Sequence, residues 1–254
     1  MMQHDMNSMP QPLNLFSQIG GDRHRTIEDQ KAMALKAEQR TRLMVRFDQI
    51  TQAMTDHELL ELLLLRVVPA EMAGPLSDHL MLQFGDFGKI ISASTARLRN
   101  VAGMNDAVMR EFRILETSAR RIARSRLLDR PLLSSWQAVL DYCHTIMAHR
   151  ETEQFRVLFL DRKNFLIADE VQGEGTVDHV PVYPREILRR ALELNASALL
   201  LVHNHPSGDP TPSQSDITMT QTIRSAAEAL SITLHDHIII GKSCELSFRS
   251  AGLL

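Results

Sequence analysis

The segment from Ala198 to Asp216, ALLLVHNHPSGDPTPSQSD, constrains the fold of this chain more than any other. Its first five residues are a continuous apolar run bounded by turn residues, which predicts a buried strand. Because successive side chains of a strand alternate between its two faces, His203 and His205 at the end of this run point to the same side. We therefore expect the two imidazoles to lie close enough to bind one metal ion, with Asn204 directed the other way.

The residues after His205 predict a loop that turns over the strand end and then opens a helix. Four of them cannot continue a strand ladder, namely Pro206, Gly208, Pro210 and Pro212. Ser213-Gln214-Ser215-Asp216 has the form of a capping box at a helix start. Asp216 can then direct its carboxylate back toward the histidines. Two neutral imidazoles, one carboxylate and one open position are typical of a catalytic zinc site.

A simpler interpretation of each feature stands beside this one. A His-x-His at a strand end is often a pair of hydrogen-bonded surface histidines. Ser213 and Asp216 are fully explained as helix caps. The metal site is favoured because the paired histidines, the rigid loop and the returning carboxylate occur together.

His203-x-His205-Pro206 followed by Ser213-x-x-Asp216 resembles the JAMM (MPN-type) metallopeptidase signature, and HNHPSGDPTPSQSD resembles the RadC (UPF0758-type) family. PVYPREIL (181–188) and LHDHIIIG (234–241) are similar to segments of that family, and the resemblance extends more weakly over nearly everything after about Phe47. It implies His203, His205 and Asp216 as zinc ligands and Ser213 as a hydrogen-bond donor beside the oxyanion. The implied fold class is α/β, with a mixed α/β JAMM/MPN-like (cytidine-deaminase-like) domain after an all-α helix-hairpin-helix-like domain.

The JAMM signature also requires an upstream glutamate as general base, and the candidates are Glu153, Glu170 and Glu174. Glu153 directly precedes the apolar strand QFRVLFLD, and TEQFRVLFLD resembles the family at this place. Glu170 and Glu174 lie in or after the next strand beside two glycines, where a hairpin or bulge is the simpler explanation. We choose Glu153 as the base, and an exposed acid before a strand is the alternative.

The reaction class that the resemblance implies is hydrolysis of an amide, in a peptide or isopeptide bond of a peptide or protein substrate. Zinc lowers the pKa of a water molecule bound to it to about 7. Glu153 would accept a proton and pass it to the leaving amine. Zinc and the Ser213 hydroxyl would stabilise the charge on the carbonyl oxygen. The sequence does not name the substrate.

Composition indicates an ordinary soluble protein, since 254 residues with 44% hydrophobic content suffice for one good-sized domain and a smaller one. A net charge of -3 gives no overall attraction to nucleic acid. Cys143 and Cys244 are too few for a disulfide framework or a cysteine zinc cluster, which fits a reducing cytosol. No apolar stretch is long enough to span a bilayer and no signal-peptide pattern is present, so we expect a cytoplasmic protein without membrane contact.

The chain divides into four expected segments. Residues 1–46 comprise a mobile tail without periodicity, up to about residue 20, and then a helix with alternating charges from Arg23 to Arg46. Residues 47–127 are an all-helical domain, in which Thr55-Asp56-His57-Glu58 caps a helix and Gly74-Pro75 interrupts the helical pattern further along. Residues 128–150 are a linker and a helix. Residues 151–254 are the metal-binding domain, where strands alternate with helices.

Residues 98–124 could contact DNA. Leu98-x-x-Val101-x-Gly103-Met104 is similar to a helix-hairpin-helix, which holds a phosphate on the backbone N–H groups of a glycine-bearing turn. The usual second glycine is replaced by Asn105, which tolerates positive φ, and Asp106 places a negative charge where the phosphate would dock. Five arginines could bind the DNA backbone without sequence specificity: Arg110, Arg113, Arg120, Arg121 and Arg124. Such a helix is otherwise a solvated face.

His235-Asp236-His237 is a second His-x-His in the chain. It could orient a metal ligand or belong to a buried polar network, and we favour a structural role. Two other functions stay open. One is an HNH-type nuclease, suggested by His203-Asn204-His205, although the proline-rich loop and Asp216 fit its ββα metal finger poorly. The other is a non-enzymatic DNA-associated module with a structural metal, and an association with DNA repair is implied by the family name alone.

Overall fold

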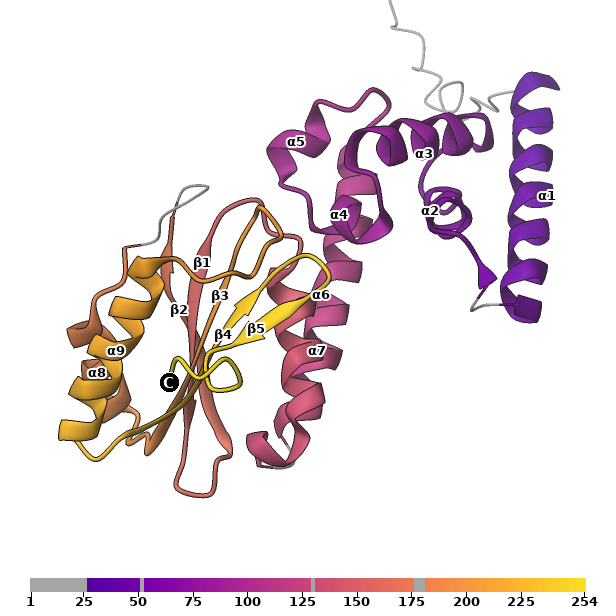
Figure 1. Cartoon of the computed structure of the whole chain (residues 1–254). Helices are drawn as coiled ribbons and strands as arrows, with labels where there is room; N and C mark the ends of the chain where they lie inside the picture. The colour runs from indigo at the N-terminus through magenta and orange to yellow at the C-terminus, as the bar shows by residue number, and fades with distance from the viewer. Residues whose placement is uncertain (1–26, 51–52, 129–130, 176–180) are drawn as a thin grey trace, which may run out of the picture.

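The computed structural model describes residues 27–50, 53–128, 131–175 and 181–254, and the predicted mobile tail lies outside them. The described helices of the N-terminal unit are α1 (Ile27–Ile50), α2 (Asp56–Leu64), α3 (Ala70–Phe84), α4 (Phe87–Ser92), α5 (Thr95–Arg99) and α6 (Asp106–Leu128) (Figure 1). The C-terminal unit comprises η2 (Leu132–Ser135), α7 (Trp136–Met147), β1 (Gln154–Leu160), β2 (Leu166–Glu174), α8 (Pro184–Glu193), β3 (Ala198–Asn204), α9 (Gln214–Ala229), β4 (Thr233–Ile240) and β5 (Glu245–Ser247). No helix within these ranges combines the length and the apolar character needed to cross a bilayer.

The helical unit encloses its own apolar core, to which α2 to α6 contribute buried leucine, isoleucine, valine and phenylalanine side chains. The expected cap of α2 is confirmed, because Thr55 and Glu58 form a reciprocal capping box. The expected break at Gly74-Pro75 was wrong, since Pro75 lies inside α3. The helix tolerates the hydrogen bond lost at Pro75 because its apolar face, with Leu76 and Leu80 both buried, packs into the core.

Five strands of the C-terminal unit form one mixed sheet in the order β2-β1-β3-β4-β5. β3 and β4 are parallel and are joined through α9, whereas β1 pairs antiparallel with both β2 and β3. Every residue of β3 is buried, as the continuous apolar run predicts for a central strand. Helix α7 covers one face of the sheet, and α8 and α9 cover the other (Figure 1).

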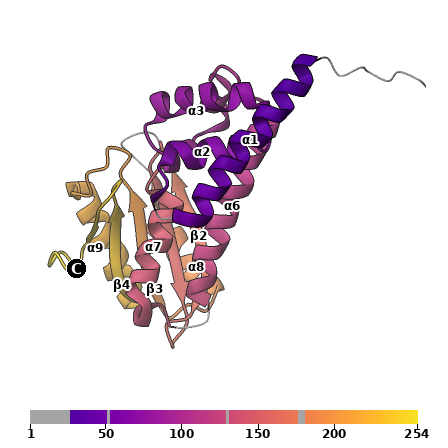
Figure 2. The same cartoon turned by 90° about the vertical axis from the view of Figure 1, so that its right-hand side faces the viewer.

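Helix α7 lies in the segment that we expected to be a linker and a helix, and it forms a full layer of the C-terminal unit. Its buried Val139 and Cys143 pack against Leu158 and Leu200 of the sheet. Helix α6 runs alongside α7 (Figure 2) and joins the two units: Phe112 belongs to the helical core, whereas Leu127 belongs to the core under the sheet. The boundary between the units therefore falls within a continuous helix.

Candidate metal centre

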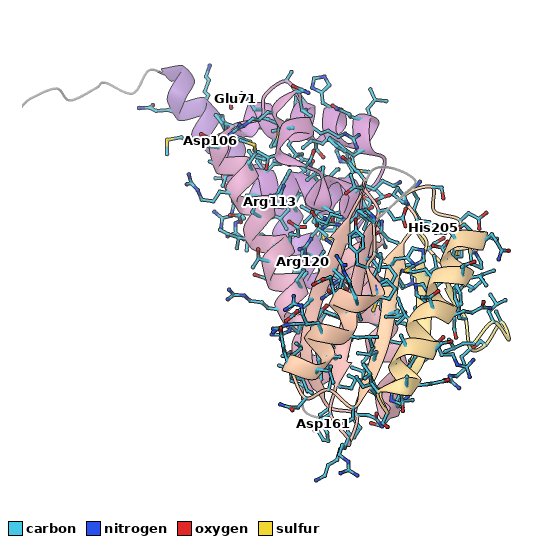
Figure 3. All side chains as sticks on the ribbon, turned by 90° about the vertical axis from the view of Figure 1, so that its left-hand side faces the viewer. Glu71, Asp106, Arg113, Arg120, Asp161 and His205 are labelled. Atoms are coloured by element: carbon cyan, nitrogen blue, oxygen red, sulfur yellow. The ribbon has the colours of Figure 1, made fainter. Side chains whose placement is uncertain are left out.

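The two histidines of the HNHP segment lie at the end of β3. The Nε2 atoms of His203 and His205 are 3.0 Å apart, and the ring of Phe155 stacks on His203 with 5.9 Å between centroids. The N–H of His205 donates to the carbonyl of Ile240, which extends the parallel pairing by one residue. Figure 3 shows His205 at one end of the sheet and Asp161, in the β1–β2 turn, at the other.

Asp216 reaches the histidines from the first turn of α9. In the capping box, the Ser213 N–H and hydroxyl donate to Asp216 Oδ2 at 2.8 and 2.6 Å, and Ser213 Oγ accepts from the Asp216 N–H. Asp216 Oδ1 lies 3.5 Å from His203 Nε2, and Oδ2 lies 3.8 Å from His205 Nε2. The cap therefore orients the carboxylate toward the imidazoles. The Ser213 hydroxyl, expected beside an oxyanion, here binds this carboxylate.

Glu153 joins this cluster from the chain just before β1. Ligand atoms of Glu153, His203, His205 and Asp216 all lie within 4.8 Å of one another. The other two candidate bases are held elsewhere by arginines: Glu170 pairs with Arg190 at 2.6 Å, and Glu174 pairs with Arg150 at 2.9 Å. Of the three glutamates, the structure thus brings Glu153 to the histidines.

The donor set fits a divalent metal ion. Imidazole nitrogens and carboxylate oxygens that bind zinc at 2.0–2.1 Å with tetrahedral angles lie roughly 3.3 Å apart. The separations of 3.0, 3.5 and 3.8 Å among His203, His205 and Asp216 bracket this value. Nitrogen and oxygen donors without sulfur are typical of catalytic zinc sites, which keep a position for water or substrate.

The electrostatics of the cluster favour the metal-binding protonation states of His203 and Asp216, whereas Asp216 favours the protonated form of His205. Burial lowers the pKa of His203 to about 4, although Asp216 acts in the opposite direction. Burial raises the pKa of Asp216, but the contacts with His205, His203 and Ser213 outweigh it and the net shift is downward. A neutral imidazole and an ionised carboxylate are the forms that act as ligands. His205 has a raised pKa, chiefly through its contact with Asp216.

Asn204, between the two histidines, holds the backbone on both sides of Glu153. Its Oδ1 accepts from the N–H of Gln154 at 2.9 Å, and its Nδ2 donates to the carbonyl of Thr152 at 3.2 Å. The Asn204 side chain is buried, and it links β3 to β1 just beyond their last backbone pair, Phe155 with His203. The HNH tripeptide therefore supplies two candidate ligands and also anchors the segment that carries the candidate base. Sequence reasoning missed this role, although the position of Asn204 on the opposite strand face was available.

The loop after β3 is closely supported by the turn between β4 and β5. A Cβ on Gly241 would lie 2.3 Å from the carbonyl oxygen of Gly208, so a larger residue cannot occupy this position without moving the loop. Lys242 Nζ donates to the carbonyl of Ser207 at 3.1 Å. The carbonyl of Asp209, in the same loop, lies 2.7 Å from Nδ1 of His205. The loop thereby fixes the ring of one candidate ligand.

The residues of His235-Asp236-His237 make contacts with three different parts of the C-terminal unit. His237 lies beneath the cluster in contact with His203, whereas His235 binds Asn164 in the β1–β2 turn. Asp236 accepts from the backbone N–H groups of His237 and Arg249 and thereby holds the end of the chain. The tripeptide thus combines an orienting contact with a polar network.

The cluster opens into a cavity of about 1000 Å³. One wall is made by Glu153, His205, Ser213 and Asp216 together with apolar neighbours such as Phe155, Tyr183 and Met219. The helical unit also lines this cavity, through Phe84, Lys89 and Arg97. Arg97 forms an ion pair with Glu151, two residues before Glu153. The helical unit is therefore part of the candidate site, which the sequence motifs did not indicate.

The helix-hairpin-helix-like segment has the expected glycine turn but a different role for Asn105. Gly103 has φ +90°, whereas Asn105 is not among the residues with positive φ. Asn105 instead caps α6, where its Oδ1 accepts from Ala107 and Val108 at 2.9 and 3.0 Å. A side-chain cap of this kind needs an extended backbone and not a left-handed one.

The predicted DNA-contacting arginines fall into two groups. Arg113 and Arg120 both bind the carboxylate of Glu116 at 2.6 Å. The remaining members are exposed on α6: Arg110, Arg121 and Arg124. DNA contact itself stays a prediction.

This sheet, with its two-sided helical cover and a His, His, Asp and Glu cluster at a strand end, is that of a JAB (MPN-like) domain. Residues 133–253 match the family model described as a RadC-like JAB domain. The match and the cluster indicate a metal site and support a metal-dependent hydrolase as the general class.

Curated relatives agree with this match. The chain is 66% identical over 203 residues to a UPF0758 protein of Rhodobacter capsulatus, covering 80% of this chain and 95% of that protein. It is 65% identical over 202 residues to a UPF0758 protein of Ruegeria pomeroyi, covering 80% and 90%. The chain therefore belongs to the RadC (UPF0758) family, which confirms the resemblance seen in the sequence.

Proposed function

We propose that this protein is a zinc-dependent hydrolase of amide bonds, acting on peptide or isopeptide bonds of peptide or protein substrates. The observation that carries this proposal is the convergence of Glu153, His203, His205 and Asp216, whose ligand atoms lie within 4.8 Å of one another beside an open cavity. Three of these side chains suffice to hold zinc, which leaves one carboxylate for proton transfer.

His203, His205 and Asp216 would hold the ion, which when bound supplies Lewis-acid chemistry that polarises a carbonyl and acidifies water. Glu153 accepts a proton from the attacking water and returns it to the amine that leaves. Asn204 holds the backbone of Glu153 in place for both transfers. Ser213 lines the cavity, and its hydroxyl can turn toward a carbonyl oxygen while its N–H still holds Asp216.

Metal analysis of the purified protein tests the site. We expect about one zinc ion per wild-type chain and a large loss in Asp216→Ala. Asp209→Asn is a matched control, because Asp209 lies in the same loop but its carboxylate binds Thr211 outside the cluster. Zinc retained by Asp216→Ala, or lost equally from both variants, would contradict the proposed ligand set.

Glu153→Gln tests the role of the base separately from the metal. We expect this variant to keep its fold and its zinc, because the amide has nearly the same shape as the carboxylate. Hydrolysis of a fluorogenic panel of peptide-linked and isopeptide-linked substrates should fall by about a hundredfold or more. Unchanged hydrolysis, with zinc still bound, would remove Glu153 from the mechanism.

The two alternatives from the sequence make different predictions. A structural metal site predicts that His205→Ala unfolds the C-terminal unit, whereas the hydrolase predicts a folded variant that has lost metal and activity. An HNH-type nuclease predicts cleavage of plasmid DNA with magnesium or zinc. Its ββα finger also differs from the observed site, where β3 lies between antiparallel β1 and parallel β4.

A further inference from the structure

A second cavity, of about 360 Å³, lies between the helical unit and the C-terminal unit. It is bordered by α6, the end of α7 and the connection between α4 and α5. All of its lining residues except Ile146 carry a polar or charged group: four hydroxyls, three guanidinium groups, one imidazole and two carboxylates. The hydroxyls belong to Ser92, Ser94, Thr145 and Thr152. Figure 3 shows two of the three arginines, Arg113 and Arg120, one after the other along the length of α6.

Buried nitrogen atoms at this cavity lack hydrogen-bond partners. Among the described residues, Arg120 Nε, Arg150 Nε and His149 Nδ1 are buried and have no partner, and all three residues line the cavity. An unsatisfied buried polar group is destabilising, because it has lost its hydrogen bonds to water without replacing them. Three of them gathered at one cavity indicate a place where an acceptor is bound.

The charges at the cavity point to an anion. Arg113 and Arg120 share a single carboxylate, Glu116, and Arg150 pairs with Glu174. The other lining carboxylate, Glu151, is held by Arg97 from the helical unit. Burial lowers the pKa of Arg150; Glu174 raises it, and the positive charge of Arg120 lowers it again. The fold therefore brings guanidinium groups together in a partly desolvated place, where an anion would relieve their repulsion.

We propose that this cavity is a phosphate-binding site. Guanidinium forks bind phosphate oxygens through paired hydrogen bonds, and the surrounding hydroxyls can donate to the remaining oxygens. Inorganic phosphate, a phosphate monoester and the backbone of a nucleic acid share this chemistry. The site is independent of the proposed hydrolase, although His149, Arg150 and Glu151 line both cavities. A bound phosphate would thus lie beside the cleft of the metal centre.

Inorganic phosphate is the probe for the experiment, with sodium chloride at matched ionic strength as reference. We expect phosphate, and not chloride, to raise the midpoint of thermal unfolding of the full chain, with saturable binding in titration calorimetry. Arg120→Gln and Arg150→Gln should each weaken binding by roughly tenfold or more, the usual effect of losing a charge-assisted hydrogen bond. Arg121→Gln is the matched control, because Arg121 is the exposed neighbour of Arg120 on α6.

Two further arms locate the site and its natural source of phosphate. Asp216→Asn, which alters the metal centre, should leave phosphate binding unchanged, and loss of binding in this variant would move the site to the metal. A short DNA duplex without terminal phosphates that competes with inorganic phosphate would assign the site to a nucleic-acid backbone, and absence of competition would assign it to a free phosphate group. Equal weakening by Arg121→Gln, or no effect of phosphate beyond that of chloride, would overturn the proposal.

Discussion

Nδ1 of His203 lies 2.8 Å from Nε2 of His237, and both imidazoles are fully buried. His237 Nδ1 lies 2.6 Å from Thr220 Oγ1, whose own proton is donated to the carbonyl of Asp216. The Thr220 hydroxyl can therefore only accept a hydrogen bond from the Nδ1–H of His237. The Nε2 of His237 then carries no proton and accepts from the Nδ1–H of His203, which leaves the Nε2 of His203 with a free lone pair. The carbonyl of Asp209 sets the same tautomer in His205. Both candidate ligands are thus prepared to bind a cation through Nε2.

Removing the Thr220 hydroxyl, where this series of hydrogen bonds begins, should weaken the metal site. Thr220→Val keeps the shape of the side chain but frees His237 to change tautomer, so we expect zinc affinity to fall by about 10–100-fold. Competition with a chelator measures this loss. Thr222→Val is the control, since the Thr222 hydroxyl binds the Thr218 carbonyl on the exposed side of α9. Equal zinc affinities of Thr220→Val and Thr222→Val would show that the hydrogen bonds from Thr220 through His237 do not orient His203.

Truncating Asn204 should loosen the segment that carries Glu153. Asn204→Ala leaves the buried N–H of Gln154 without a partner and removes the contact with the carbonyl of Thr152, so we expect a loss of about 1–3 kcal/mol in the free energy of unfolding. Hydrogen exchange of the Gln154 amide should accelerate locally. Exchange at Gln154 that matches the wild type, while global stability falls, would contradict the anchoring role.

The contact between the two units can be tested at Gly88 in α4. A Cβ at this position would lie 2.6 Å from Nε2 of His149, so Gly88→Ala should destabilise the protein by about 1–3 kcal/mol through overpacking. In a His149→Ala background the same substitution should stabilise it by about 1 kcal/mol, the helix preference of alanine over glycine. Chemical denaturation measures both. The same cost in both backgrounds would exclude a contact with His149.

The expected DNA contact can be tested at the arginines that do not bind Glu116. Because Arg121 and Arg124 are exposed on α6, replacing both with glutamine should leave folding unchanged. If α6 binds a DNA backbone, affinity for duplexes of any sequence should fall. The slope of log affinity against log salt concentration should become shallower, as expected for the loss of about two phosphate contacts. Fluorescence anisotropy over a range of salt concentrations measures both. Unchanged affinity and slope would place any DNA contact elsewhere.

Much of the C-terminal unit can be predicted from local patterns in the sequence. The apolar run before His203, the proline-rich loop and the capping box at Ser213 predict strand, turn and helix in this order, and each is found. Period-two geometry also predicts that His203 and His205 face one side, as their 3.0 Å separation shows. Gly74-Pro75 misled because tertiary burial of α3 outweighs the local cost of a proline.

The choice of Glu153 over Glu170 and Glu174 rests on a resemblance and on the two glycines beside the other glutamates, and neither observation places a glutamate near the histidines. Their surroundings differ only after folding: the antiparallel register of β1 with β3 brings the start of β1 to the end of β3, where the histidines lie. Arg190 and Arg150 bind the other two glutamates from different elements. The cavity wall from α3 to α5 likewise depends on how the two units pack.

Local sequence patterns specify most of the helices and strands and the candidate metal ligands, because strand period, helix capping and turn residues act over a few neighbouring positions. The packing of the folded chain determines which distant residues meet: Thr220 and His237 behind His203, Asn204 beside the backbone of Glu153, and the helical unit at the cavity of the metal centre. These contacts join residues far apart in the chain, and they arise from sheet register and core packing, which no local pattern contains.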